Sequence, residues 1–249
     1  MSQAQVEAPP APQASTASTA SASAKRDRRS LRSQRALRDA LAPELAEKGD
    51  LSQLSVAGLT ERAGLTRRTF YSHYQDIPDF VEKVEAELLE DIAKLIRGIA
   101  ATTLAQVYEN INALEPCPGS VELLQYFVDN RELVGALMGP GGDPAFIQKI
   151  TVLARDEVAD RMKTGITGAA LGTFFDYYLS YVIAAEVGVV QHWFETGLRE
   201  SPEVLARLMT VIAFVRPGDL YGQPIDINVP AYGLLLSKLK PAPRESEEI

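Results

Sequence analysis

The chain has 249 residues, of which 46% are hydrophobic and 23% are charged, so it is long enough for one or two domains with a large core. No apolar run approaches the roughly 18 residues that suggest a membrane span, and the N-terminus lacks the basic start and apolar core of a secretory signal. A single cysteine, Cys117, excludes an internal disulfide and is typical of a reducing compartment. We therefore expect a cytoplasmic protein with no membrane partner.

The net charge of −8 is distributed unevenly along the chain. Residues 25–75 hold eleven Lys and Arg against six Asp and Glu, a balance of +5, whereas residues 76–249 carry −12. A basic head on an acidic body is expected when one end of a protein meets phosphates and the other does not. Charge segregation alone is weak evidence, so a DNA-binding function also requires a motif.

Residues 1–24 are predicted to form a disordered arm, because Ala, Ser, Gln and Pro dominate there and charge is nearly absent. Residues 25–38 contain seven basic side chains and lead into the first helix. Pro43 predicts a kink in this helix, and Gly49 predicts its end. We favour phosphate or minor-groove contact for this basic segment. The alternative is a solvated tail.

Residues 55–74 have the pattern of two short helices joined by a tight turn. Val56, Leu59 and Ala63 form one apolar face, and Ser55 is placed to cap the first helix. Gly64 follows the last apolar position, where a helix readily ends in a left-handed conformation. The pattern predicts a helix-turn-helix.

The second helix follows Thr66, a further N-cap candidate, and Phe70 and Tyr74 are spaced to face inward. Its other side chains are basic, hydroxyl and aromatic groups that suit phosphates and base edges in a major groove. The predicted DNA contacts are Ser55, Thr66, Arg67, Arg68, Thr69, Tyr71 and His73. Taken alone, a short helix with arginines is usually a solvated surface, so the prediction depends on the whole block.

This block resembles the TetR family of bacterial transcription regulators. The residues that match the family pattern are Ser55, Leu59, Thr60, Ala63, Gly64, Leu65, Thr66, Thr69, Tyr71, His73 and Tyr74. The resemblance implies an all-α fold, with a three-helix DNA-binding domain over residues 25–77 and a larger helical effector-binding and dimerisation domain over residues 78–215. We assign no role to the C-terminal tail, residues 216–249.

Two positions depart from the family pattern. The family usually has a phosphate-binding lysine just after the block, where this chain has Ile77, and Gly58 replaces a residue of higher helix propensity. An alternative function is therefore a TetR-like coactivator that does not read DNA itself. We favour a ligand-responsive repressor that binds a near-palindromic, double-stranded DNA operator as a homodimer.

The body is predicted to be helical. Asp76 and Pro78 begin a helix that an apolar stripe extends to about Ala100, and in the family this helix transmits the ligand state to the head. A loop at residues 116–119 precedes helices over residues 121–130, 131–138 and 144–163. Residues 130–150 resemble the branch of the family that includes the dihydroxyacetone-kinase regulator.

Two strongly apolar helices follow, over about residues 169–196 and from Pro202 to a stop at Pro217. A helix that is apolar on every side needs neighbours on every side. In the family these helices form a four-helix bundle with their copies in a second subunit, and two-fold dimers are the commonest assembly. The residues predicted at this interface are Val189, Trp193, Leu205 and Met209. The alternative is the core of a monomer.

Aromatic side chains are candidates for an effector pocket inside the body, suited to a small and mainly hydrophobic molecule. These residues are Tyr126, Phe127, Phe174, Tyr177, Tyr178 and Tyr181. At helical spacing such residues are more often ordinary core. The sequence does not identify the effector.

The sequence does not favour an enzyme. The two histidines, His73 and His192, are far apart, and there is no Gly-rich phosphate loop, HExxH motif or nucleophile elbow. No converging metal ligands are visible. We therefore expect no catalytic residues, no cofactor and no metal.

Overall fold

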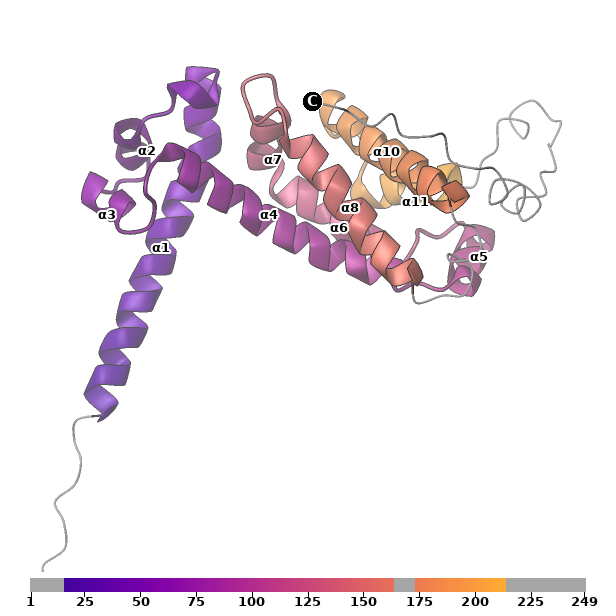
Figure 1. Ribbon diagram of the computed structural model, residues 1–249, viewed down its shortest axis with the longest axis horizontal. Helices are drawn as coiled ribbons and strands as arrows, with labels where there is room; N and C mark the ends of the chain where they lie inside the picture. Colours follow the sequence, from indigo (N-terminus) through magenta and orange to yellow (C-terminus); the bar gives the residue numbers. More distant parts are fainter. Residues whose placement is uncertain (1–15, 164–172, 214–249) are drawn as a thin grey trace, which may run out of the picture.

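The computed structural model describes residues 16–163 and 173–213, and these residues form helices and no strand (Figure 1). The predicted all-α fold is therefore confirmed. A small group of N-terminal elements, here called the head, precedes a larger group of helices, here called the body. No helix among the described residues is long and apolar enough to cross a membrane.

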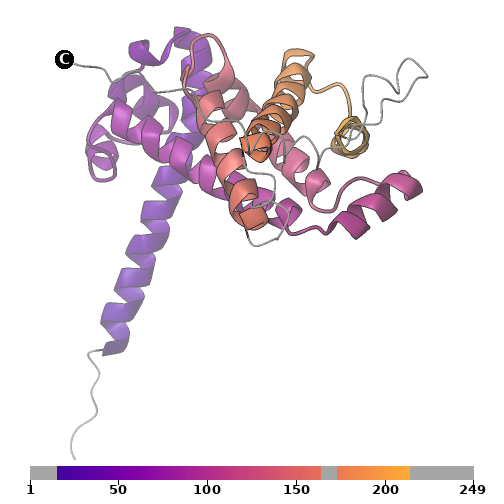
Figure 2. The same cartoon turned by 45° about the vertical axis from the view of Figure 1, so that its right-hand side comes forward.

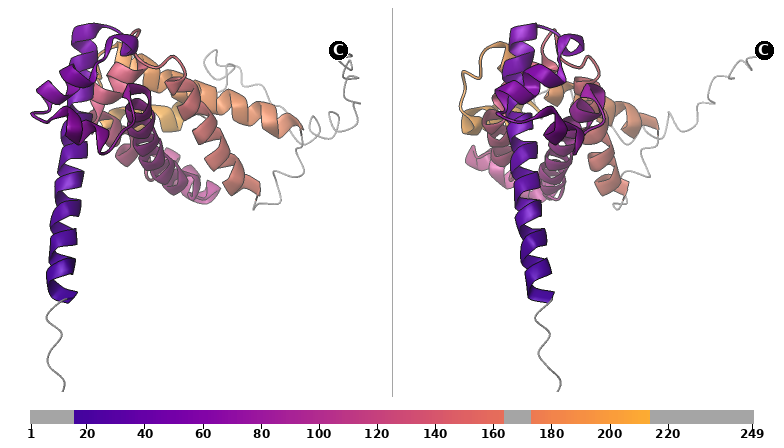
Figure 3. Two further views of the ribbon diagram at one scale, coloured as in Figure 1. Left: turned by 60° about the vertical axis from the view of Figure 1, so that its left-hand side comes forward. Right: turned by 90° about the vertical axis from the view of Figure 1, so that its left-hand side faces the viewer.

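The head comprises four elements. They are α1 (Thr16–Lys48), the short 3-10 helix η1 (Leu51–Gln53), α2 (Val56–Arg62) and α3 (Arg67–Tyr71). The N-terminal half of α1 projects away from all other helices in both views of Figure 3. Its C-terminal half packs against α2 and against α7 of the body.

Helix α1 begins earlier than predicted. Residues 16–24, which we predicted to be disordered, are helical, and residues 1–15 lie outside the described part of the chain. The physical reason is composition: four of these nine residues are Ala, the strongest helix former, and the segment contains no proline. At the other end, α1 continues through the exposed Pro43 and stops before Gly49, which has φ +77°.

Helix α4 (Ile77–Ala100) connects the head to the body (Figure 1). The Asp76 carboxylate accepts a hydrogen bond from the Asp79 amide at 2.9 Å, so the predicted N-cap is confirmed. Phe80, Val84 and Leu88 lie on the buried face that continues to Ile96. This face packs against α6 and α8, so a single helix spans both parts of the molecule.

The rest of the body consists of six helices among the described residues, of which the fourth and fifth are the longest (Figure 2). The helices are α5 (Leu104–Ala113), α6 (Ser120–Asp129), α7 (Arg131–Met138), α8 (Phe146–Lys163), α10 (Thr173–Glu195) and α11 (Pro202–Ile212). Helix α10 packs on α8, and α11 packs on α6. The predicted stop at Pro217 and the predicted helix start near residue 169 lie outside the described residues.

The sequence prediction missed helix α5. Its start carries a reciprocal cap, in which Thr103 and Gln106 each accept a hydrogen bond from the other's backbone amide. This Thr-x-x-Gln spacing is a recognised signature of a helix start, so a signal was present in the sequence.

Candidate nucleic-acid interface

The first helix of the motif, α2, is fixed by its cap and by one buried side chain. The Ser55 hydroxyl accepts a hydrogen bond from the Gly58 amide at 3.1 Å, as predicted. Leu59 is completely buried, and Val56 and Ala63 pack partly buried on the same core. The predicted apolar face is therefore confirmed.

The turn between α2 and α3 depends on Gly64. Its φ of +64° lies in the left-handed region that favours glycine. The Leu65 amide then donates to the Thr60 carbonyl at 2.8 Å, which closes the turn. Thr66 caps α3, because its hydroxyl accepts a hydrogen bond from the Thr69 amide at 3.2 Å.

An aromatic cluster anchors α3 to the head. The Phe70 ring is fully buried, and its centroid lies 5.4 Å from that of Tyr74 and 5.8 Å from that of Phe80. Burial raises the pKa of Tyr74 to about 12, so its phenol stays neutral. The Lys83 ammonium lies 5.4 Å from the Tyr74 ring centroid. Because one face of this five-residue helix is held by these rings, its other face is presented in a fixed orientation.

The opposite face of α3 carries the predicted DNA contacts. Arg67, Arg68 and Tyr71 are exposed, as are the two capping residues Ser55 and Thr66. Thr69 and His73 are partly buried, Thr69 within hydrogen-bonding distance of the Thr66 hydroxyl and His73 beside the Tyr74 ring. Six of the seven residues thus lie on or next to α3, and Ser55 lies at the start of α2.

A buried carboxylate, which sequence reasoning missed, lies beneath α2. Glu44 of α1 is 3% exposed, and one of its oxygens accepts a hydrogen bond from Arg62 Nε at 3.0 Å. A Cβ atom at position 58 would lie 2.0 Å from the other oxygen, Oε1. Gly58 therefore leaves the space that Glu44 occupies, and this accounts for one departure from the family pattern.

A loop of the body closes against the head. The Leu51 amide of η1 donates to the Gly141 carbonyl at 2.9 Å, and Arg38 of α1 donates to the Asn130 side chain at 2.9 Å. A Cβ atom on Gly141 would lie 1.9 Å from the Gly49 carbonyl oxygen. The glycine at position 141 is thus required for this close approach.

The six residues predicted to line an aromatic effector pocket are divided between the core and the surface of a single chain, and the pocket remains a prediction. Tyr177 and Tyr181 are 75% and 72% exposed, and Phe127 is buried in the core. Two cavities within the described part of the chain are lined by other residues and by none of the six predicted side chains. The physical reason is that α10 buries one face against α8, so aromatic residues on its other faces remain outside. The remaining positions are partly exposed: Tyr126 on α6, and Phe174 and Tyr178, whose rings stack on each other.

Two of the four residues predicted at a dimer interface belong instead to the core of one chain. Trp193 is 1% exposed, and its Nε1 donates to the Glu200 carbonyl at 3.0 Å, while Leu205 is also buried. Val189 and Met209 are partly buried against the same core. The exposed apolar residues of α11 are Val204, Leu208, Val211 and Ile212. Helical periodicity identified the helices correctly and their exposed face incorrectly.

Comparisons with known proteins point to a class of regulator. Residues 115–214 match a model of the C-terminal region of TetR-type transcriptional regulators. The chain is also 24% identical over 172 residues to an uncharacterized HTH-type transcriptional regulator, YxbF, of Bacillus subtilis strain 168. This match covers 69% of the chain and 42% of that relative's length. The match over residues 115–214 covers most of the body. It is therefore separate in sequence from the helix-turn-helix motif of the head.

Proposed function

We propose that the chain is a TetR-type transcription regulator, as its similarities suggest, and that it is a ligand-responsive repressor that binds an operator as a homodimer. The observation that carries the proposal is the presentation of α3. Its inner face is fixed by Phe70, Tyr74 and Phe80, whereas Arg67, Arg68 and Tyr71 project into solvent. A rigid helix with exposed guanidinium groups suits the edges of guanine and the phosphates that flank them.

The basic half of α1 supports the same proposal. This helix projects from the head (Figure 3) and contains all seven Lys and Arg residues of the segment 25–38. A basic helix beside a recognition helix supplies phosphate contacts that raise affinity without reading sequence. Such a protein would act in the cytoplasm, where DNA is accessible.

Dimerisation is proposed through the exposed faces of α10 and α11. Val204, Leu208 and Val211 recur at spacings of four and three residues, so they lie on one side of α11. Tyr181 and Gly188 are exposed on α10, and no atom within 4 Å would meet a Cβ at position 188. Apolar side chains in a row favour a partner, and a two-fold axis would give two heads for a near-palindromic site.

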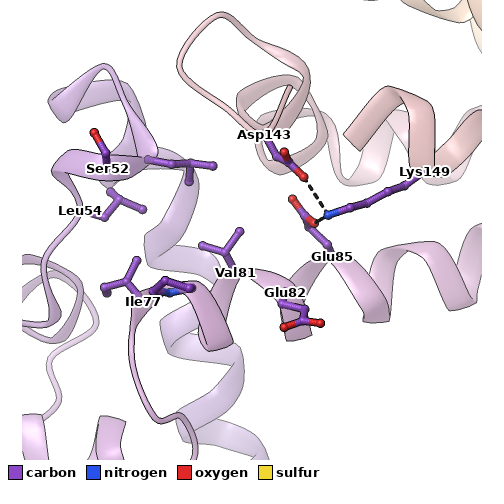
Figure 4. Close-up of a pocket in the computed structure, with 10 residues that line it drawn as sticks. Ser52, Leu54, Ile77, Val81, Glu82, Glu85, Asp143 and Lys149 are labelled. Atoms are coloured by element: carbon purple, nitrogen blue, oxygen red, sulfur yellow. Dashed lines mark hydrogen bonds and ion pairs between the residues drawn. The ribbon is translucent and has the colours of Figure 1, made fainter. Parts of the chain in front are cut away.

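A coactivator that does not read DNA is the second candidate, and one observation favours it. Ile77, at the position where the family usually has a phosphate-binding lysine, lines a cavity together with Leu54 and Val81 (Figure 4). One anchor to the DNA backbone is therefore missing. The exposed arginine pair, Arg67 and Arg68, still favours DNA binding.

The experiment is selection of bound fragments from random DNA at two salt concentrations, followed by sequencing. We expect a near-palindromic motif whose binding weakens as salt rises, because phosphate contacts release counterions. Arg67→Ala or Arg68→Ala should weaken operator binding by about 1–3 kcal/mol if the side chain reads a base. Arg199→Ala, at an exposed position of the body, is the matched control and should bind normally. A folded dimer that enriches no sequence would favour the coactivator.

A further inference from the structure

A cavity of about 540 Å³ lies between the head and the body (Figure 4). Leu51 and Leu54 line it from the head, Ile77 and Val81 from the start of α4, and Lys149 from α8. Its volume is within the range of about 300–1,000 Å³ that small-molecule sites occupy. The cavity combines apolar walls with a few charged groups, as ligand sites commonly do.

The charged groups of this cavity favour a cation. Glu82, Glu85 and Asp143 line it together with Lys149. The Lys149 ammonium donates hydrogen bonds to Asp143, at 2.8 Å, and to Glu85, so its charge is already compensated. An anionic ligand would meet the excess of carboxylates, whereas a cation would complement it.

Glu85 supplies an independent indication that a donor is missing. Its side chain is 2% exposed, and one oxygen accepts from Lys149. The other oxygen, Oε1, is buried without a hydrogen-bond partner among the described residues. In Figure 4 the Glu85 carboxylate lies between Val81, on the apolar side of the cavity, and Lys149. Burial raises the pKa of Glu85, and the hydrogen bond from Lys149 opposes that rise. A buried acceptor without a donor is unfavourable, and a ligand N–H group would satisfy it.

We propose that this cavity binds a small amphipathic organic cation, with its ammonium group at Glu85 and its apolar part against Leu51, Leu54 and Ile77, while the exposed Glu82 adds negative charge to the cavity lining. The site is separate from the aromatic residues of α10. It also gives a role to Ile77, because a lysine there would place a second cation in the apolar wall.

The position of the site connects binding to the orientation of the head. Its walls come from η1, from α4 and from α8, and the Leu51–Gly141 hydrogen bond joins the same two parts of the molecule. A ligand that fits one arrangement of these walls better than another shifts the population toward it. Regulation of operator binding through this site rests on the proposed function, whereas binding of the cation does not.

The test uses the full chain and hexylammonium as the probe, with hexanol and hexanoate as neutral and anionic controls of equal length. Calorimetric titration should give hexylammonium an affinity at least about tenfold higher than that of either control. Glu82→Gln, at an exposed position, should weaken binding about two- to fivefold, as expected for a solvent-screened pair. Glu90→Gln, on the same helix but outside the cavity lining, should leave affinity unchanged. Val81→Trp should fill the cavity and abolish binding.

Three results would overturn the site. They are the absence of hexylammonium binding, equal binding of hexanol or hexanoate, and full affinity in a folded Val81→Trp variant. If Val81→Trp does not fold, the comparison of Glu82→Gln with Glu90→Gln decides, and equal affinities count against the site. Operator affinity is then measured with and without saturating hexylammonium, and an unchanged affinity refutes the regulatory role. Failure to bind DNA without the probe contradicts the proposed function instead, and the titration, which contains no DNA, distinguishes the two failures.

Discussion

Substitution of Gly58 by alanine should destabilise the protein, although helix propensity alone predicts the opposite. Alanine is favoured over glycine in a helix interior by about 1 kcal/mol. At position 58, however, the new methyl group would lie 2.0 Å from Glu44 Oε1 and 2.8 Å from its Cδ. Forcing an extra carbon into a packed site costs about 1–3 kcal/mol. We therefore expect Gly58→Ala to lower the free energy of unfolding by about 1 kcal/mol.

The physical cause can be isolated by a double-mutant cycle. In a Glu44→Ala background the methyl group has space, so Gly58→Ala should raise the free energy of unfolding by about 1 kcal/mol. The change of sign corresponds to an interaction energy of about 2 kcal/mol between the two positions, within the range for residues in contact. Gly98→Ala is the matched control, because a Cβ at that position of α4 meets no atom within 4 Å. It should be stabilising in both backgrounds.

Urea denaturation monitored by circular dichroism measures these differences in the free energy of unfolding. The melting temperature should change by about 2–4 °C for each kcal/mol. The reasoning is refuted if Gly58→Ala stabilises the protein as much as Gly98→Ala does. It is also refuted if the effect of Gly58→Ala is the same with and without the Glu44 side chain. Either result would mean that the carboxylate does not occupy the space beneath α2.

Three further predictions follow from the same structure. Burial raises the pKa of Glu186 to about 7, from 4.5. Between these pH values the folded state binds more protons than the unfolded state, so the free energy of unfolding should fall by up to about 3 kcal/mol as pH rises through this window. Glu186→Gln should remove that pH dependence, as measured by urea titrations at pH 5 and pH 8. Leu208→Glu should yield a folded monomer in light scattering, because Leu208 is exposed on the proposed dimer face. Trp193→Asp should yield an unfolded chain, because Trp193 is buried in the core. A folded dimer in either case contradicts the placement of these two side chains. Ser55→Ala should cost about 1 kcal/mol by removing the cap of α2, and no measurable loss in thermal unfolding would count against that hydrogen bond.

The local structure of the head could be predicted from the sequence. The caps at Ser55 and Thr66, the turn at Gly64 and the inward positions of Phe70 and Tyr74 were all predicted, and the structure confirms them. Each depends on interactions between residues at most a few positions apart, and side-chain chemistry restricts those interactions to few conformations. The DNA contacts themselves remain predictions, because they depend on a partner molecule.

The exposed faces and the cavities were decided by the tertiary structure. Periodicity placed apolar residues on α10 and α11, but it did not tell which side would meet α8 or α6 and which would stay exposed, as the positions of Trp193 and Leu208 illustrate. Glu44 and Gly58, or Ile77 and Lys149, are brought together only when distant helices pack. The sequence by itself determined most of the helices and the caps and turn of the reading motif, because these follow from neighbours along the chain. Packing determined the junction cavity and the free apolar surface, because these follow from neighbours in space.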